Sequence, residues 1–309
     1  MSPRKGGSGA VGPVKRRTSG GPSKRRTRRG GQDAVDRHIT SQLTPGVKSL
    51  LKHFGLRPQK GFGQNFLIDD EILARIVEVA DLRSDDQVVE VGPGLGVLTR
   101  ELVSRVRRVI AVEIDRGMAE ALQTLFSDQP NLEVVNQDIL SFRPGQHLDE
   151  NPYKVVANLP YYITSPTLRL FLESERQPTS IIVMVQKEVA ERIVAKPGDL
   201  SLLAVSVQFY AEPMIVARVP RMAFYPAPKV DSAVVRIDVR PTPVVPVDPE
   251  KFFRVVSAGF AQPRKQLHNA LSRVLWLPED AASEALRAVG IDETRRAQTL
   301  TLPEWGALA

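Results

Sequence analysis

Residues 88–114, VVEVGPGLGVLTRELVSRVRRVIAVEI, decide the fold that this sequence predicts. The apolar run at 88–91 predicts a strand, the glycines after it predict a tight turn, and residues 98–106 predict a helix. A second apolar run at 109–114 predicts another strand. Strands that are apolar along their whole length and joined by a helix are typical of a parallel sheet covered on both faces.

The alternation of strands and helices continues beyond this unit, so we expect an α/β fold. The further helices are expected near 50–54, 72–80, 118–126 and 168–172, and the further strands at 132–135, 154–157, 181–185, 205–210 and 232–237. Asp69 or Asp70 is placed to cap the helix that begins near residue 72. Because the segment at 232–237 alternates, we expect it to pair in an antiparallel manner.

The chain divides into three parts by composition. Residues 1–32 hold ten Lys or Arg and no acid, whereas the rest holds 32 basic and 35 acidic residues. The basic tail, residues 1–40, is expected to be disordered and to contact phosphate backbones; a solubilising tail or an organellar transit peptide are the alternatives. Residues 45–242 form the expected α/β domain. A proline-rich linker precedes an expected small helical domain at 250–309.

The composition also bounds the kinds of site and compartment. The chain has no cysteine, which excludes disulfides and thiolate metal sites. The four histidines are far apart in the sequence, so we expect no metal site; they are His38, His53, His147 and His268. There is neither a secretory signal pattern nor an apolar run near the roughly 18 residues of a membrane helix. We therefore expect a cytoplasmic protein without a membrane partner.

The turn after the first predicted strand indicates a cofactor site. Gly92, Gly94 and Gly96 follow a Gly-x-Gly-x-Gly pattern rather than the Gly-x-Gly-x-x-Gly of dinucleotide sites. Glu113 ends the next strand, where its carboxylate can accept hydrogen bonds from both ribose hydroxyls. Asp138 ends the third strand, where it can accept one from an adenine amino group. Together they indicate a nucleoside without a pyrophosphate, namely S-adenosylmethionine; an NAD enzyme or a purely structural turn are the alternatives.

The fourth predicted strand ends in Asn158-Leu159-Pro160-Tyr161, a pattern typical of methyltransferases that act on exocyclic amino groups. An adenine N6 lone pair is delocalised into the ring and is a poor nucleophile. The Asn158 side-chain oxygen and a backbone carbonyl, that of Leu159, can accept its two N–H bonds and stabilise the developing charge. Pro160 stiffens the turn, and Tyr161 offers a stacking face for an extruded base. The alternative is an ordinary loop after a buried strand.

With these motifs, the chain resembles the KsgA/RsmA family of small-subunit ribosomal RNA adenine dimethyltransferases and is similar also to their relatives, the Erm resistance methyltransferases. The resemblance runs from about residue 50 to the C-terminus. The other segments that carry it are GQNFL at 63–67, VQKEVAER at 185–192 and FYPAPKVDS at 224–232. It implies a Rossmann-like methyltransferase sheet followed by a small all-α domain that helps to dock RNA.

The resemblance also implies roles for individual residues. The cofactor contacts that it implies are Asn65, Leu67, Gly92, Gly94, Glu113, Asp138 and Asn158. The catalytic residues are Asn158, Leu159, Pro160 and Tyr161, with Phe224 on the other side of the target base. A core aromatic is the alternative for Phe224.

The implied substrate is a pair of adjacent adenosines in the 3′-terminal hairpin of small-subunit rRNA, within a pre-ribosomal particle, and the enzyme is expected to be a monomer. One alternative is an Erm-type enzyme that acts on large-subunit rRNA and confers macrolide resistance. Another is a non-catalytic assembly or transcription factor on the same scaffold. In the segment 260–265, Pro263 stands where the family usually has a basic residue, so the resemblance does not extend to the RNA contact expected at that position.

Overall fold

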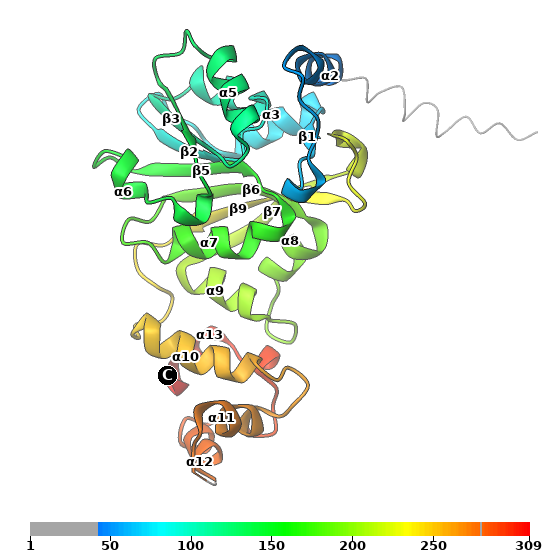
Figure 1. Cartoon of the computed structure of the whole chain (residues 1–309). Helices are drawn as coiled ribbons and strands as arrows, with labels where there is room; N and C mark the ends of the chain where they lie inside the picture. The colour runs from blue at the N-terminus through cyan, green and yellow to red at the C-terminus, as the bar shows by residue number, and fades with distance from the viewer. Residues whose placement is uncertain (1–42, 279) are drawn as a thin grey trace, which may run out of the picture. The chain divides into compact units, whose positions relative to one another are not determined.

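The computed structural model describes residues 43–278 and 280–309 (Figure 1). The predicted basic tail at 1–40 lies outside them. Within the described residues, a seven-stranded sheet has the order β4-β3-β2-β5-β6-β9-β7, and β1 pairs with β8 in a small second sheet. The strands are β1 (Phe66–Leu67), β2 (Gln87–Val91), β3 (Arg108–Glu113), β4 (Leu132–Asn136), β5 (Tyr153–Asn158), β6 (Ser180–Gln186), β7 (Ala211–Val219), β8 (Phe224–Tyr225) and β9 (Ser232–Val239).

The directions of the strands decide where a ligand can bind. The five strands from β4 to β6 are parallel, as the sequence predicts. Strand β9 is antiparallel to both β6 and β7, which confirms the expectation for its alternating segment. The chain order reverses between β2 and β5, because β3 and β4 lie on one side and β6 on the other. Ligands of open α/β sheets bind at the carboxyl ends of the strands at such a reversal.

Helices cover both faces of the sheet (Figure 1). Val88, Val156 and Ile182 point into one apolar cluster, with α3 (Asp70–Val79) and α4 (Val97–Val103). The residues next to them in the strands point into a second cluster with α7 and α9. This alternation explains why nearly every position of the central strands is buried and why most of those positions are apolar. The other helices of this part are α2 (Leu43–His53), α5 (Arg116–Leu125), α6 (Pro144–His147), α7 (Thr164–Leu172), α8 (Lys187–Ile193) and α9 (Leu202–Tyr210).

One predicted strand is wrong: residues 205–210 belong to helix α9, which begins after the cap Ser201. Val205, Val207 and Phe209 have high strand propensity and alternate with Ser206 and Gln208, which is a strand-like pattern. In the structure the segment is buried on nearly every side, so no polar face marks the helical period. The strand is the next segment, β7, which the prediction missed. It contains Pro213, and β7 tolerates a proline because it lies at the edge of the sheet.

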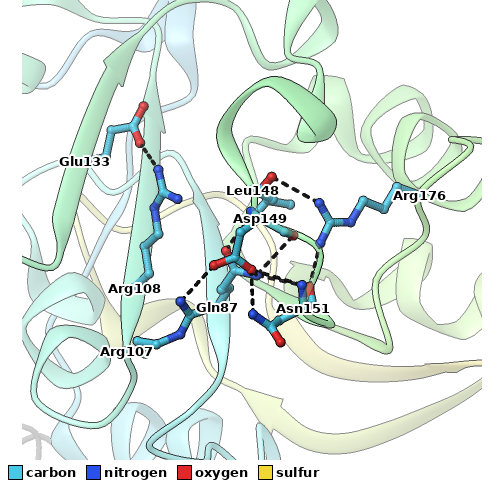
Figure 2. A network of polar contacts seen from close by, with 8 residues as sticks. All are labelled: Gln87, Arg107, Arg108, Glu133, Leu148, Asp149, Asn151 and Arg176. Carbon is cyan, nitrogen blue, oxygen red and sulfur yellow. Dashed lines mark hydrogen bonds and ion pairs between the residues drawn. The ribbon is translucent and has the colours of Figure 1, made fainter.

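A polar network ties the chain together where β2, β3 and β5 begin, at the end of the sheet opposite to their carboxyl ends (Figure 2). The buried Gln87 side chain donates to Asp149 Oδ1 at 2.7 Å and to the Asn151 carbonyl at 3.0 Å. Arg107 pairs with Asp149 Oδ2 at 2.8 Å and holds the pKa of that carboxyl well below its usual range. Arg176 binds the Asn151 carbonyl at 2.6 Å. These contacts fix the long loop between β4 and β5.

The C-terminal part is helical, as predicted, with four α-helices among its described residues: α10 (Pro249–Phe260), α11 (Leu267–Leu275), α12 (Ala281–Ala288) and α13 (Leu302–Leu308). Trp305 is fully buried among them. The Phe252 ring of α10 stacks on Phe209 of α9, with 4.3 Å between centroids. The apolar cluster beneath the sheet therefore continues into these helices.

Candidate active site

A cavity of about 350 Å³ opens at the carboxyl ends of β2 to β5, within the usual size range of small-molecule sites. Every predicted cofactor-binding residue lines it, and so do Leu159, Pro160 and Tyr161. These residues come from segments as far apart in the sequence as Asn65 and Tyr161. Phe224 is the one predicted site residue that does not line the cavity.

The glycine turn between β2 and α4 shapes one wall. Gly92, Gly94 and Gly96 have φ values of 67°, 56° and 78°, in the left-handed region that favours glycine. A Cβ at Gly94 would lie 2.9 Å from the Phe66 ring, and one at Gly96 would lie 2.4 Å from the Phe126 ring. Gly94 and Gly96 are therefore both needed for packing, and Gly92 and Gly94 also present backbone to the cavity.

Glu113 lies at the end of β3 with only 5% of its surface exposed. Its Oε2 accepts the Gly94 backbone N–H at 3.0 Å, and its Oε1 accepts that of Asp115 at 2.9 Å. Burial raises the pKa of this carboxyl, while the two backbone donors act in the opposite direction. Each oxygen keeps acceptor capacity for a ligand hydroxyl, because a carboxylate oxygen has two lone pairs.

Glu90 is a second buried acid in the cavity wall, and the sequence analysis gave it no role. It is 1% exposed, and its Oε2 has no hydrogen-bond partner among the described residues. Burial, with a smaller contribution from the nearby Glu113, raises the pKa of Glu90 to about 8. The sequence alone could have indicated Glu90, because it is an acid near the end of a predicted buried strand.

An apolar slot lies beside Asp138. Ile114 and Leu140 line the cavity although each is about two-fifths exposed, at 43% and 39%. Asp138 lies two residues beyond β4, rather than at its end, and its Oδ1 accepts the Leu140 backbone N–H at 2.9 Å. Its second oxygen remains an acceptor at the edge of the slot. This arrangement suits a flat heterocycle that carries an amino group.

Asn158 is the last residue of β5, and the three residues that follow it, up to Tyr161, are also held in a fixed conformation. The Asn158 side-chain Nδ2 donates to the Asn65 backbone carbonyl at 2.9 Å. The backbone N–H of Leu159 donates to the Met184 carbonyl of β6 at 3.1 Å. The Tyr161 hydroxyl lies 2.9 Å from Ser232 Oγ of β9, and burial raises the pKa of this tyrosine. Ser232 is a positioning contact that the sequence analysis missed, because β9 is 71 residues away.

Phe224 is 3% exposed and packs in the apolar cluster with α3 and α4. It pairs with Leu67 across the small sheet of β1 and β8. Leu67 does line the cavity, so Phe224 supports the cavity wall from behind. This placement favours the core alternative, and a contact between Phe224 and the target base stays a prediction.

Among residues 43–278 and 280–309, no three His, Asp or Glu side chains are grouped so that they could hold a metal ion. Within the same described part, none of the helices is both long enough and apolar enough to cross a membrane.

Comparisons with known proteins agree with this geometry. The family model described as ribosomal RNA adenine dimethylase matches residues 55–307. A protein of Dehalococcoides mccartyi (strain ATCC BAA-2100) named ribosomal RNA small subunit methyltransferase A is 48% identical over 268 residues, which is 86% of this chain and 92% of that relative. Its namesake from Clostridioides difficile (strain 630) is 43% identical over 270 residues, 85% of this chain and 93% of that relative.

Two solved structures share the fold. The 23S rRNA methyltransferase ErmE superposes with a TM-score of 0.62 at 34% identity, over 79% of this chain and 98% of ErmE. A dimethyladenosine transferase from Plasmodium falciparum superposes with a TM-score of 0.69 at 26% identity, over 79% of this chain and 95% of that one. The chain belongs to the ribosomal RNA adenine dimethylase family, with the proteins named small subunit methyltransferase A among its relatives.

Proposed function

We propose that this enzyme transfers methyl groups from S-adenosylmethionine to N6 of two adjacent adenosines in the 3′-terminal hairpin of small-subunit rRNA, giving N6,N6-dimethyladenosines. The observation that carries the proposal is the orientation of Asn158. Its Nδ2 is bound to the Asn65 carbonyl, which leaves Oδ1 as an acceptor in the cavity lined by Glu113 and Asp138.

The residues of the cavity fit the cofactor. Glu113 is a fixed, buried carboxylate suited to the ribose hydroxyls. Ile114 and Leu140 offer apolar faces for the adenine, and Asp138 can accept from its amino group. Glu90 and Glu113 bring two buried acids to a cavity whose ligand would carry positive charge. The remaining predicted contacts, Asn65, Leu67, Gly92 and Gly94, complete the walls.

The chemistry then depends on how the chain holds the target adenine. When bound, S-adenosylmethionine supplies a methyl group on a positively charged sulfur. The N6 lone pair would form the bond to the methyl carbon as the carbon–sulfur bond breaks and its electron pair goes to sulfur, so positive charge would move from the sulfur to the nitrogen. Asn158 Oδ1 and the Leu159 carbonyl accept hydrogen bonds from the N–H groups of adenine N6 and stabilise the positive charge on that nitrogen. Tyr161 stacks on the adenine ring. The product nitrogen loses its proton easily, so no strong general base is needed.

The choice of substrate rests on the names of similar proteins. The relatives at 42–48% identity are named small subunit methyltransferases, whereas ErmE, a 23S rRNA enzyme, is 34% identical. This difference favours small-subunit rRNA over the macrolide-resistance alternative. A purely non-catalytic factor would not need the fixed Asn158 amide beside a cofactor cavity.

We further propose how the chain is organised around this reaction. Residues 45–242 form the catalytic domain, and the helical residues 250–309 dock RNA within a pre-ribosomal particle. The enzyme acts as a monomer in the cytoplasm. The basic tail at 1–40 adds sequence-independent attraction to phosphates.

A deletion strain tests the proposal. Ribosomal RNA from a strain that lacks the gene is digested and searched for dimethyladenosine in both subunits, with complementation by the wild-type gene or by Asn158→Ala. We expect two adjacent dimethyladenosines near the 3′ end of the small-subunit rRNA to vanish and to return only with the wild type. Loss of a large-subunit modification instead would establish the Erm-type alternative.

A further inference from the structure

Asp115 joins the cofactor side of the cavity to a distant loop. It lies two residues after Glu113 and is 6% exposed. Its Oδ1 caps α5 by accepting the backbone N–H groups of Gly117 and Met118. Its Oδ2 accepts the side-chain amides of Gln59 at 2.8 Å and Gln64 at 2.9 Å. The helix cap uses only one carboxylate oxygen of Asp115. The other oxygen binds Gln59 and Gln64, which lie 56 and 51 positions earlier in the sequence.

The 59–65 loop is also fixed internally. Gln64 Oε1 accepts the Gln59 backbone N–H at 2.8 Å, so the orientation of the Gln64 amide is set at both of its ends. The Asn65 side chain donates to the Gly63 carbonyl at 2.9 Å, and Gly63 has a φ of 63°. The glutamine contacts therefore hold the loop that leads directly into the Asn65 backbone.

The far end of the same loop touches the catalytic asparagine. The Asn65 carbonyl accepts the Asn158 Nδ2 bond at 2.9 Å. A carboxamide presents an acceptor on one side and two donors on the other, and a half-turn exchanges them. The Asn65 carbonyl selects the orientation in which Asn158 Oδ1 is free. If the amide turned over, it would present donors to the N–H bonds of an incoming adenine amine.

We propose that Gln59, Gln64 and Asp115 form a latch that holds the Asn65 carbonyl in place and, through it, orients the Asn158 amide for methyl transfer. The three are positioning residues that act through Asn158 and do not touch the amine. The inference rests on the proposed function, since it assigns the latch a part in that reaction. It also links the strand that carries Glu113 to the strand that carries Asn158, across the cavity.

Polarity exchange gives the sharpest variants. Gln64→Glu sets a carboxylate against Asp115 Oδ2, and Asp115→Asn sets an amide group against the two glutamine amides. Asp115→Asn keeps an oxygen that can cap α5. The double variant with both Gln64→Glu and Asp115→Asn restores a hydrogen bond between the two positions, in which the side chain at position 115 donates and the side chain at position 64 accepts. Gln59→Met removes one donor at an exposed position without adding charge, so the latch stays testable if a charged variant does not fold.

The readout is the single-turnover rate of methylation, with saturating S-adenosylmethionine and unmethylated small-subunit particles. Gln64→Glu and Asp115→Asn are each expected to slow it by about 10-fold to 100-fold, as for a misplaced catalytic group. The combined variant recovers most of the rate, and Gln59→Met shows a smaller loss. Asp248→Asn is the matched control, because Asp248 caps α10 and contacts none of the latch residues. It should leave the rate unchanged, and melting temperatures exclude global unfolding as the cause.

A double-mutant cycle with Asn158→Ala decides whether the latch acts through Asn158. We expect Gln64→Glu to cause no further loss when Asn158 is already Ala, since the amide that it orients is gone. An equal loss in both backgrounds overturns the latch, and so does a wild-type rate for Gln64→Glu alone. If instead Asn158→Ala alone keeps the wild-type rate, the catalytic role of Asn158 in the proposed function fails as well. The rate of this single variant therefore distinguishes failure of the proposed function from failure of the latch alone.

Discussion

The Asn158 side chain donates its Nδ2 hydrogen bond to the backbone carbonyl of Asn65 at 2.9 Å. The contact spans 93 residues of sequence and joins the end of β5 to the segment before β1. Because Nδ2 is bound to Asn65, the Asn158 amide presents its Oδ1 as a hydrogen-bond acceptor to a ligand in the cavity.

Asn158→Ala should lower turnover by about 100-fold or more, as for loss of a preorganised partner of developing charge. Asn158→Asp keeps an acceptor but loses the donor to Asn65, so it should also be slow. Steady-state kinetics on unmethylated small-subunit particles measures both, and the melting temperature is the control for folding. Wild-type turnover in Asn158→Ala would remove this residue from the mechanism.

Tyr161→Ala should weaken the contact with the target base by roughly 1–3 kcal/mol, the usual value of base–aromatic stacking. Tyr161→Phe retains the ring and loses only the hydrogen bond to Ser232, so its effect should be smaller. The matched control is Ser232→Ala, which should resemble Tyr161→Phe. The measurement is kcat/KM for the particle. An equal loss in Tyr161→Phe and Tyr161→Ala would show that the hydroxyl, not the ring face, matters.

Glu113→Ala should weaken S-adenosylmethionine binding by roughly 1–3 kcal/mol, the cost of removing a charged hydrogen-bond partner. The variant also leaves the Gly94 N–H without its acceptor, so the glycine turn is expected to loosen. Glu120→Ala, on the exposed face of α5, is the control and should bind normally. Calorimetry measures both. Unchanged affinity in Glu113→Ala would contradict the ribose assignment.

Much of this site follows from local sequence, because it is built from strand ends. A parallel sheet brings the carboxyl ends of β2, β3 and β5 to one edge, so the Gly92 turn, Glu113 and Asn158 could be placed together from the alternation of elements. The part that sequence did not predict depends on tertiary contacts. Nothing local to Asp115 indicates that two glutamines more than 50 residues away bind it, and nothing near Tyr161 points to Ser232.

The strand predicted at 205–210 failed for a related reason. The segment that became α9 is buried on nearly every side, and its pattern therefore carries no helical period. Its tertiary surroundings, including Phe252 against Phe209, decide its conformation instead of its β-branched residues. Phe224 illustrates the converse, since its place in a distinctive motif drew attention to a side chain that lies in the core.

Glu90 makes folding stability depend on pH. Its pKa rises from 4.5 to about 8 on burial, so the folded state binds the proton more tightly than the unfolded state. This contribution is fully present below pH 4.5 and is lost as pH rises towards 8. Relative to Glu90→Gln, the cofactor-free wild type should therefore lose a few kcal/mol across that window, at about 1.36 kcal/mol per pKa unit.

Urea unfolding of the wild type and Glu90→Gln at several pH values between 5 and 8 measures this difference. All other ionisable groups are common to both proteins, so their contributions cancel. A difference in unfolding free energy that does not change with pH would mean that Glu90 is ionised in the folded state.

The central claim is that this chain itself dimethylates two adjacent adenosines of small-subunit rRNA through Asn158. The most direct measurement incubates the purified full chain with isotopically labelled S-adenosylmethionine and ribosomal subunits from a strain that lacks the modification, and maps the label by mass spectrometry of rRNA fragments. We predict four labelled methyl groups on two neighbouring adenosines near the 3′ end of the small-subunit rRNA, and none with Asn158→Ala under the same conditions. Label in large-subunit rRNA, or equal labelling by Asn158→Ala, would contradict the account.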